Sequence, residues 1–149
     1  MIQRIQTLFL LAITILSAAL IFLPFQEIKA GESTYQLCLM PGCLSGMVKP
    51  FIYVPIALNF VILVLSAVTI FMYKNRKKQM KFAQLLLLFS ALLIGNLFVM
   101  HFLKGDEAAM QINYKIASFF PAINAVCAFL AMRFIKKDEE LVRSADRIR

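Results

Sequence analysis

The chain has 149 residues, of which 61% are apolar, and it carries a formal net charge of +8. Soluble domains use apolar residues at about half of their positions, so this composition excludes an ordinary soluble domain and indicates an integral membrane protein. Most of the chain is taken up by long apolar runs, and we therefore expect a single membrane domain, residues 1–149.

The first of four apolar runs covers residues 8–25. It approaches the about 20 residues that a helix needs to cross a hydrocarbon core of roughly 30 Å. Arg4 precedes the run, as in a secretory signal, but the apolar core exceeds the roughly 7 to 15 residues of such signals, and Ile28-Lys29-Ala30 is a poor cleavage site. We therefore predict that this span is retained.

Three further runs follow, and none contains Asp, Glu or Lys; they cover residues 51–73, 82–103 and 116–135. Arg133 lies close enough to the end of the last run for its head group to reach the interface. Pro55 and Pro121 each remove a backbone donor, so we expect them to bend their helices. The sequence thus predicts an all-α integral membrane protein, a bundle of four transmembrane helices.

Lys and Arg are distributed unevenly along the chain. Twelve of the sixteen lie at Arg4, in the loop 74–81, or from Arg133 onward. Short loops rich in basic residues stay on the cytoplasmic side of a membrane, so we expect both termini in the cytoplasm. This bias alone accounts for the net charge, and nucleic acid is not expected as a partner.

The longest outer segment covers residues 26–49. Within it, STYQLCLM has the Thr, Tyr and alternating apolar residues of a short strand, and Pro41-Gly42 marks a turn. These features predict a small strand-like outer loop, with a hairpin or strand pair over the bundle. The second outer loop, residues 104–115, is expected to be a simple connector.

Cys38 and Cys43 flank the turn, and their spacing allows the Cα separation of roughly 4.4 to 6.8 Å that a disulfide needs. A structural disulfide is one interpretation. A thiol relay is another, although Cys127 lies inside the fourth run and the second outer loop has no cysteine. Copper handling is a third, because thiolate and thioether suit Cu(I). The other candidate residues on the outer side are Met40, Met47, Met100 and His101.

Four polar residues lie seven or eight positions in from the outer ends of their spans, at a similar depth of roughly 10 to 12 Å. They are Ser17, Asn59, Asn96 and Asn124. We expect the asparagines to point inward and bond across helices, because lipid offers carboxamides no partner. The layer is either structural or a polar pocket for a lipid or small ligand. Two small-xxx-small steps predict close packing nearby: Ala91 with Gly95, and Ser118 with Ala122.

Residues 136–149 continue the fourth run as a charged segment with apolar residues at helical spacing. Lys136 with Glu140 is one of its i,i+4 pairs. We expect an amphipathic C-terminal cytoplasmic helix, which either anchors in lipid or docks another protein. The residues assigned to docking are Arg4, Arg143, Asp146 and Arg147.

The sequence lacks the residues that common activities need. No span carries a carboxylate for ion coupling, and the single histidine has no acidic residue in its own run. Nucleophile motifs, phosphate-binding loops and zinc spacings are missing from it as well. We therefore expect a non-enzymatic protein with no cofactor and no bound metal.

The two ends of the chain, IQRIQTLFLLA and IKKDEELVRSADRIR, resemble the end signatures of an uncharacterised family of small four-span inner-membrane proteins of Bacteroidetes, classed as a domain of unknown function. The resemblance implies a bacterial inner-membrane location and supplies no activity. We expect an accessory or scaffold subunit of a larger membrane complex, with membrane lipids and other inner-membrane proteins as partners. Ligand binding in the polar layer, and thiol or copper handling at the outer loop, are the alternatives.

Overall fold

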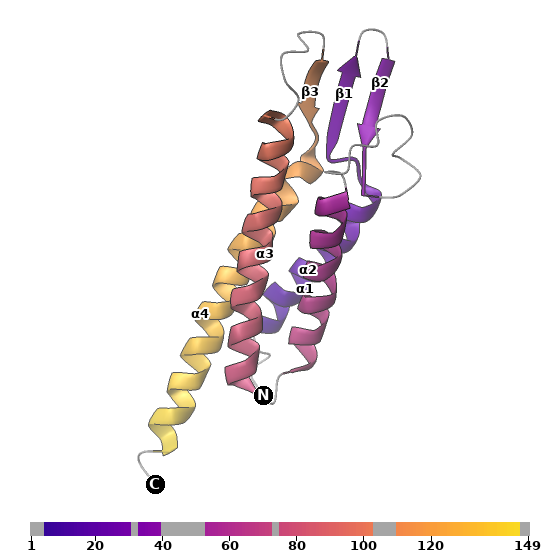
Figure 1. The fold of residues 1–149 in the computed structure, drawn as a ribbon. Helices are drawn as coiled ribbons and strands as arrows, with labels where there is room; N and C mark the ends of the chain where they lie inside the picture. Colours follow the sequence, from indigo (N-terminus) through magenta and orange to yellow (C-terminus); the bar gives the residue numbers. More distant parts are fainter. Residues whose placement is uncertain (1–4, 31–32, 40–52, 73–74, 103–109, 147–149) are drawn as a thin grey trace.

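The structure is a computed structural model that describes residues 5–30, 33–39, 53–72, 75–102 and 110–146. Within these residues, four long helices form a bundle and three short strands form a sheet at one end of it (Figure 1). The helices are α1 (Ile5–Phe22), α2 (Tyr53–Phe71), α3 (Arg76–Phe102) and α4 (Phe120–Asp146), and a 3-10 turn, η3 (Ile116–Phe119), precedes α4.

Each of the four helices is long and apolar enough to cross a membrane. They fall on the four runs predicted from the sequence, and α4 continues through the predicted C-terminal helix as far as Asp146. The expected all-α bundle is therefore confirmed, and the chain is a multi-pass membrane protein.

Prolines mark the ends of the helices. Helix α1 ends at Phe22, two residues before Pro24, because the residue before a proline avoids the helical conformation. Pro55 lies in the first turn of α2, and Pro121 lies in the first turn of α4. Backbone donors in a first turn have no acceptor within their helix. Both prolines therefore lie where helices begin. The sequence had led us to expect that they would bend the helices in mid-span, and they do not lie there.

The sheet has the strand order β2-β1-β3, and both pairings are antiparallel. Strand β2 (Ser33–Leu37) falls in the predicted STYQLCLM segment and pairs with β1 (Gln26–Ala30), which precedes it, so a strand pair is present as expected. The turn predicted at Pro41-Gly42 lies outside the described residues. Strand β3 (Met110–Tyr114) lies in the segment expected to be a simple connector, and that expectation is wrong. Strand β1 pairs with β2 along one edge only. Its other edge offers backbone donors and acceptors, and β3 forms by pairing with them, for example Tyr114 with Gln26.

The helices form a ring in which α1 and α3 each pack against both α2 and α4. Residues buried in this ring recur at alternating spacings of four and three, which is the heptad spacing of coiled coils. We call these positions the seam. In α1 and α2 they are Gln6, Leu10, Ile13, Ser17 and Leu20, and Pro55, Asn59, Ile62, Ser66 and Thr69. In α3 and the η3–α4 segment they are Gln79, Ala83, Leu86, Ser90, Leu93 and Leu97, and Ala117, Pro121, Asn124, Ala128, Ala131 and Ile135.

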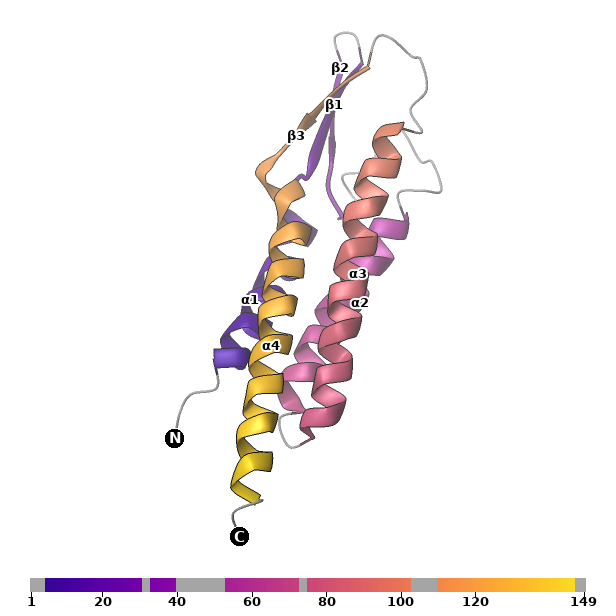
Figure 2. The same cartoon turned by 90° about the vertical axis from the view of Figure 1, so that its left-hand side faces the viewer.

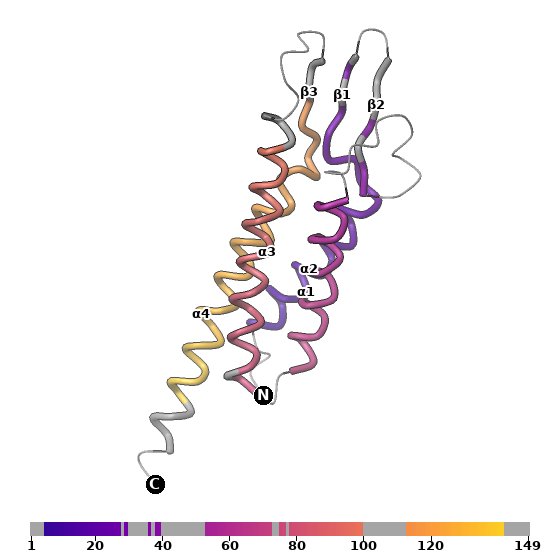
Figure 3. The backbone as a smooth tube through the Cα atoms, viewed as in Figure 1, coloured from indigo at the N-terminus to yellow at the C-terminus, as the bar shows by residue number. Residues whose placement is uncertain are grey.

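The end of the bundle that carries the strands is called the sheet end, and the opposite end, where α1 and α3 begin and α4 finishes, is called the basic end. At the basic end α4 continues past the start of α3 (Figure 3). The last turns of α4 project beyond the other helices, in the views of both Figure 1 and Figure 2. The bundle thus carries a sheet at one end and the projecting turns of α4 at the other.

Candidate functional site

Three of the four predicted layer residues meet inside the bundle. Asn59 donates from Nδ2 to the backbone oxygen of Ser17 at 3.0 Å, and Asn124 donates from Nδ2 to Ser17 Oγ at 3.1 Å. Asn59 is 1% exposed and Asn124 is fully buried. Because Ser17 is a seam residue of α1, these two bonds join α1 to α2 and to α4 at one level.

Asn96 is not part of this group of hydrogen bonds. A small cavity of about 10 Å³ is lined by Pro55, Pro121 and Leu20, which lie one turn nearer the sheet end than the layer, and by Leu93 and Leu97 of α3. Asn96 therefore lies at the level of the cavity. Its Oδ1 atom is buried and has no hydrogen-bond partner within the described residues.

The carboxamide oxygens of the seam are mostly unpaired. Asn59 and Asn124 use their nitrogens as donors, but their Oδ1 atoms accept no hydrogen bond from the described residues. The same holds for the side-chain oxygens of Gln6 and Gln79 near the basic end. Helices satisfy their own backbone donors, so a bundle supplies few donors for such oxygens. The 10 Å³ cavity is at the lower limit of the roughly 10–15 Å³ that a single water needs.

Further polar contacts that the depth argument did not include cross the bundle. The hydroxyls of Thr14 and Ser66 lie 2.9 Å apart and join α1 to α2. Gln79 donates from Nε2 to the backbone oxygen of Thr69 at 3.3 Å and joins α3 to α2. Ser66 and Thr69 have heptad spacing with Asn59 along α2, and this spacing was the signal in the sequence that could have identified these two positions.

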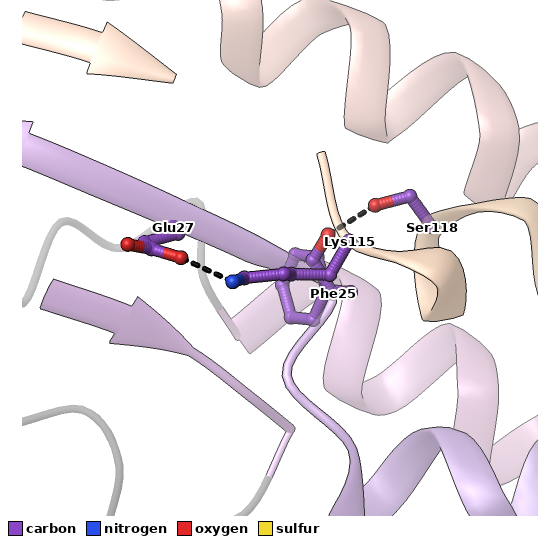
Figure 4. Close-up of polar contacts among 4 residues, drawn as sticks. All are labelled: Phe25, Glu27, Lys115 and Ser118. Atoms are coloured by element: carbon purple, nitrogen blue, oxygen red, sulfur yellow. Dashed lines mark hydrogen bonds and ion pairs between the residues drawn. The ribbon is translucent and has the colours of Figure 1, made fainter. Parts of the chain in front are cut away.

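At the sheet end, the carbonyl of Phe25 holds two segments together (Figure 4). It accepts a hydrogen bond from the Lys115 backbone nitrogen at 3.1 Å and another from the Ser118 hydroxyl. Lys115 also forms an ion pair with Glu27. The hydrogen bond from Lys115 holds the pKa of Glu27 below its ordinary value and outweighs burial, which raises the pKa. The charges of Lys115 and Lys29 have smaller effects than burial and lower the pKa further.

The cysteines fall into two groups. Cys38 follows β2, is 2% exposed and is disulfide-bonded, whereas Cys127 on α4 is a free thiol. Cys43 lies outside the described residues, so its pairing with Cys38 stays a prediction. Of the residues considered for copper, Met40 and Met47 also lie outside the described residues. Met100 and His101 are in the last turn of α3, and their side chains are not described.

The docking residues predicted at the two termini are described only in part. Arg4 and Arg147 lie outside the described residues, while Arg143 and Asp146 belong to the last turns of α4 without described side chains. Arg76 donates from Nη1 to the backbone oxygen of Asp138 at 2.9 Å, and this bond ties α3 to α4 where the projection begins.

The small-xxx-small step on α3 faces away from the bundle. Ala91 and Gly95 are exposed, because the seam of this helix uses Ser90, Leu93 and Leu97 instead. Within the described residues, no atom lies within 4 Å of the position that a Cβ atom on Gly95 would take. The expectation that this step packs inside the bundle is therefore wrong.

The comparisons with known proteins give one match, which covers residues 2–148. The chain belongs to the family described as "Domain of unknown function (DUF4293)". This agrees with the resemblance of the two ends to an uncharacterised family. Neither the curated proteins nor the solved structures gave a match.

The match spans the bundle, the sheet and all of α4, so these are parts of a single family domain. Its polar layer is built from amides and a hydroxyl, which exchange hydrogen bonds and do not titrate near neutral pH. Within the described residues there is no group of three or more His, Cys, Asp or Glu side chains that could hold a metal ion. The layer is thus suited to joining helices.

Proposed function

We propose that this protein is a small, non-enzymatic accessory subunit of a larger complex in the bacterial inner membrane. A transmembrane helix of the partner packs on the outward face of α3, at Ala91 and Gly95. The observation that supports this proposal is the exposure of Gly95 within a membrane-spanning helix, where no described atom outside the adjoining backbone of α3 lies near the position of its missing side chain.

Glycine inside a helix is less favourable than alanine by roughly 0.5–1 kcal/mol. A lipid-facing position normally holds a bulky apolar side chain, as Leu88, Leu92 and Phe98 do on the same side of α3. Small residues four positions apart allow two helix backbones to approach closely in a membrane. No described helix of this chain packs closely on Ala91 and Gly95. We therefore assign the helix that packs there to a second protein.

The same proposal places the basic end in the cytoplasm. Arg76, Lys78 and Lys81 lie at the start of α3, and Arg133, Lys136 and Lys137 lie toward the end of α4. Basic residues flanking spans favour the cytoplasmic side. The projecting end of α4 would then meet a soluble part of the partner while α3 meets its membrane helix.

Ligand binding in the polar layer has less support. The cavity beside the layer has a volume of only about 10 Å³, and its lining is formed by apolar residues and prolines. Thiol chemistry has less support as well, since the disulfide-bonded Cys38 is only 2% exposed and exchange requires access to its sulfur.

The test compares Gly95→Leu with Ala57→Leu, a small-to-large change at an exposed position of α2. Gly95→Leu should fold with unchanged or slightly higher thermal stability, because the added side chain meets no described atom. It should lose at least about 90% of a partner that co-purifies with the native protein in mild detergent, an effect of 1.4 kcal/mol or more on binding. Ala57→Leu should retain that partner.

Two outcomes would contradict the proposal. If the native protein purifies with no stoichiometric partner, or only with a second copy of itself, it is not an accessory subunit. If Gly95→Leu retains the partner while a chain ending at Lys137 loses it, docking occurs through the end of α4 and the assignment to α3 is wrong.

A further inference from the structure

A groove lies between α3 and α4 at the basic end. It has a volume of about 830 Å³ and is lined from both helices by apolar, amide and charged side chains. The lining residues that the argument uses are Met80, Leu130, Arg133, Phe134, Lys136 and Lys137. The volume falls within the roughly 300–1,000 Å³ of small-molecule sites.

The three basic residues of the groove form no ion pair with a carboxylate in the described part of the chain. They are Arg133, Lys136 and Lys137, and Glu140 is four residues after Lys136. Glu140 also lines the groove, so the lining carries three positive charges and one negative charge. Basic groups concentrated beside a bilayer attract anionic head groups.

The position of the Arg133 guanidinium adds a second reason. Its central carbon lies 5.9 Å from the centre of the Phe129 ring, one helical turn nearer the middle of the membrane. The guanidinium therefore lies over the face of an aromatic ring that belongs to the membrane-spanning part of α4. A charge in this position is stabilised by the ring and by an anion at the same depth.

From these observations we infer that the groove binds an anionic phospholipid, with the phosphate between Arg133 and the two lysines and an acyl chain along the apolar lining. Met80, Leu130 and Phe134 provide the apolar surface, and Phe134 is itself held by stacking on Phe9 of α1 at 5.6 Å. A soluble phosphate would use the charges alone. A phospholipid uses both kinds of lining, and the bilayer presents it to the groove directly.

The chain has no tryptophan, so one introduced tryptophan is a unique reporter. Phe129→Trp places it under Arg133, where an indole ring also favours the cation. Phe71→Trp is the control, at an exposed position on the basic end of α2. Each variant is reconstituted in phosphatidylcholine vesicles containing a small fraction of brominated phosphatidylglycerol or brominated phosphatidylcholine, and quenching reports which lipid contacts the ring.

Brominated phosphatidylglycerol should quench Phe129→Trp with at least tenfold preference over brominated phosphatidylcholine, and Phe71→Trp should show a much weaker preference. A lysine near a charged surface contributes roughly fivefold to affinity, so adding Lys136→Gln and Lys137→Gln should reduce the preference by about tenfold or more. Adding Lys78→Gln and Lys81→Gln instead removes the same charge outside the groove. The preference for phosphatidylglycerol should then stay within about twofold of that of Phe129→Trp alone.

The assignment would be overturned if Phe129→Trp and Phe71→Trp showed the same preference for phosphatidylglycerol. It would also be overturned if the two double lysine substitutions reduced that preference equally. Either result would mean that anionic lipid is attracted diffusely to the basic end. Displacement of the brominated lipid by millimolar inorganic phosphate would identify a simple phosphate site and overturn the assignment to a phospholipid. Circular dichroism and thermal unfolding of each variant show whether the helices are intact. If the lysine pair in α4 unfolds the protein, Lys136→Arg with Lys137→Arg should retain the fold and the preference, and loss of preference in that folded variant overturns the site.

Discussion

The sheet end and the basic end both carry charged and polar residues, but these residues are paired differently at the two ends. At the sheet end, polar and charged groups are paired between elements: Lys115 with Glu27, and Ser118 and the Lys115 backbone with the Phe25 carbonyl. At the basic end, Lys136 and Lys137 have no carboxylate partner within the described residues, and α4 projects beyond its neighbours.

This difference indicates that the polar residues of the sheet end stabilise the fold, while those of the basic end interact with other molecules. The contacts at the sheet end hold α1 and α4 in register through β1, β3 and the polar layer. Apart from Arg76, which bonds the Asp138 carbonyl, the charged side chains described at the basic end form no hydrogen bond or ion pair that joins helices, and we expect them to meet lipid or another protein. The same chemical change should therefore have a large effect toward the sheet end and a small effect at the basic end.

The largest contrast is expected from changing an asparagine to aspartate at both ends. Asn124→Asp removes the donor to Ser17 and places a carboxyl group at a fully buried position of the bundle. We expect a loss of about 3 kcal/mol in the free energy of unfolding, because an acid inside a membrane is unfavourable by about that amount. Denaturant unfolding in a fixed detergent, followed by circular dichroism, measures it.

Asn75→Asp is the matched change at the basic end. Asn75 is exposed and immediately precedes α3, where aspartate is as good a capping residue as asparagine and is favoured by the helix dipole. Its stability should equal that of the native protein or exceed it slightly. If both variants lose the same free energy, the bundle does not depend on the polar layer.

A smaller contrast is expected between two cysteines. Cys38→Ser removes a disulfide at a buried position and should lower the free energy of unfolding by about 2 kcal/mol, toward the low end of the usual range. Cys127→Ser changes a free thiol on α4 and should lower it by less than about 1 kcal/mol. Alkylation should modify Cys38 only after reduction, and full modification without reductant would show that no disulfide forms.

The sequence was sufficient for the helices, because a membrane span must have about 20 apolar residues whatever its neighbours are. It was insufficient for strand β3, since Met110–Tyr114 is short and becomes a strand by pairing with β1. It also placed Ala91 and Gly95 on the wrong side of α3. Spacing alone shows that two small residues share a face, and only the rest of the bundle decides where that face points.

The seam shows why apolar periodicity is a poor guide inside a membrane. Lipid is as apolar as leucine, so the outward positions of the helices hold large apolar side chains and the buried ones include Gln6, Ser17, Asn59 and Thr69. Polar residues at heptad spacing were the informative signal. The depth measured from the ends of the apolar runs correctly placed Asn59 and Asn124 near Ser17. It misplaced Asn96 by about one turn, because α3 extends further toward the sheet end than the other helices do (Figure 1).

The smallest expected effect concerns the ion pair of the sheet end. Glu27 is largely covered, with 13% of its side chain exposed, whereas the Lys115 side chain is 44% exposed, so solvent weakens their attraction. Glu27→Gln should lower the thermal midpoint slightly at neutral pH. Glu140→Gln, the matched change at the basic end, should leave the midpoint unchanged, because Glu140 forms no ion pair with a described residue.

The pH dependence separates the ion pair from a general effect of charge. The pKa of Glu27 is lower in the folded chain than its ordinary value of 4.5, chiefly through the hydrogen bond from Lys115. A lowered folded pKa means that the unfolded chain takes up the proton first, so the stabilisation is complete above the ordinary value and is lost as the pH falls through the folded value. The midpoints of the native protein and Glu27→Gln should therefore differ at pH 7 and converge as the pH falls below the lowered pKa of Glu27 in the folded chain. A difference that persists at low pH would mean that Glu27 acts by packing, and the contrast between the two ends would then not extend to their charges.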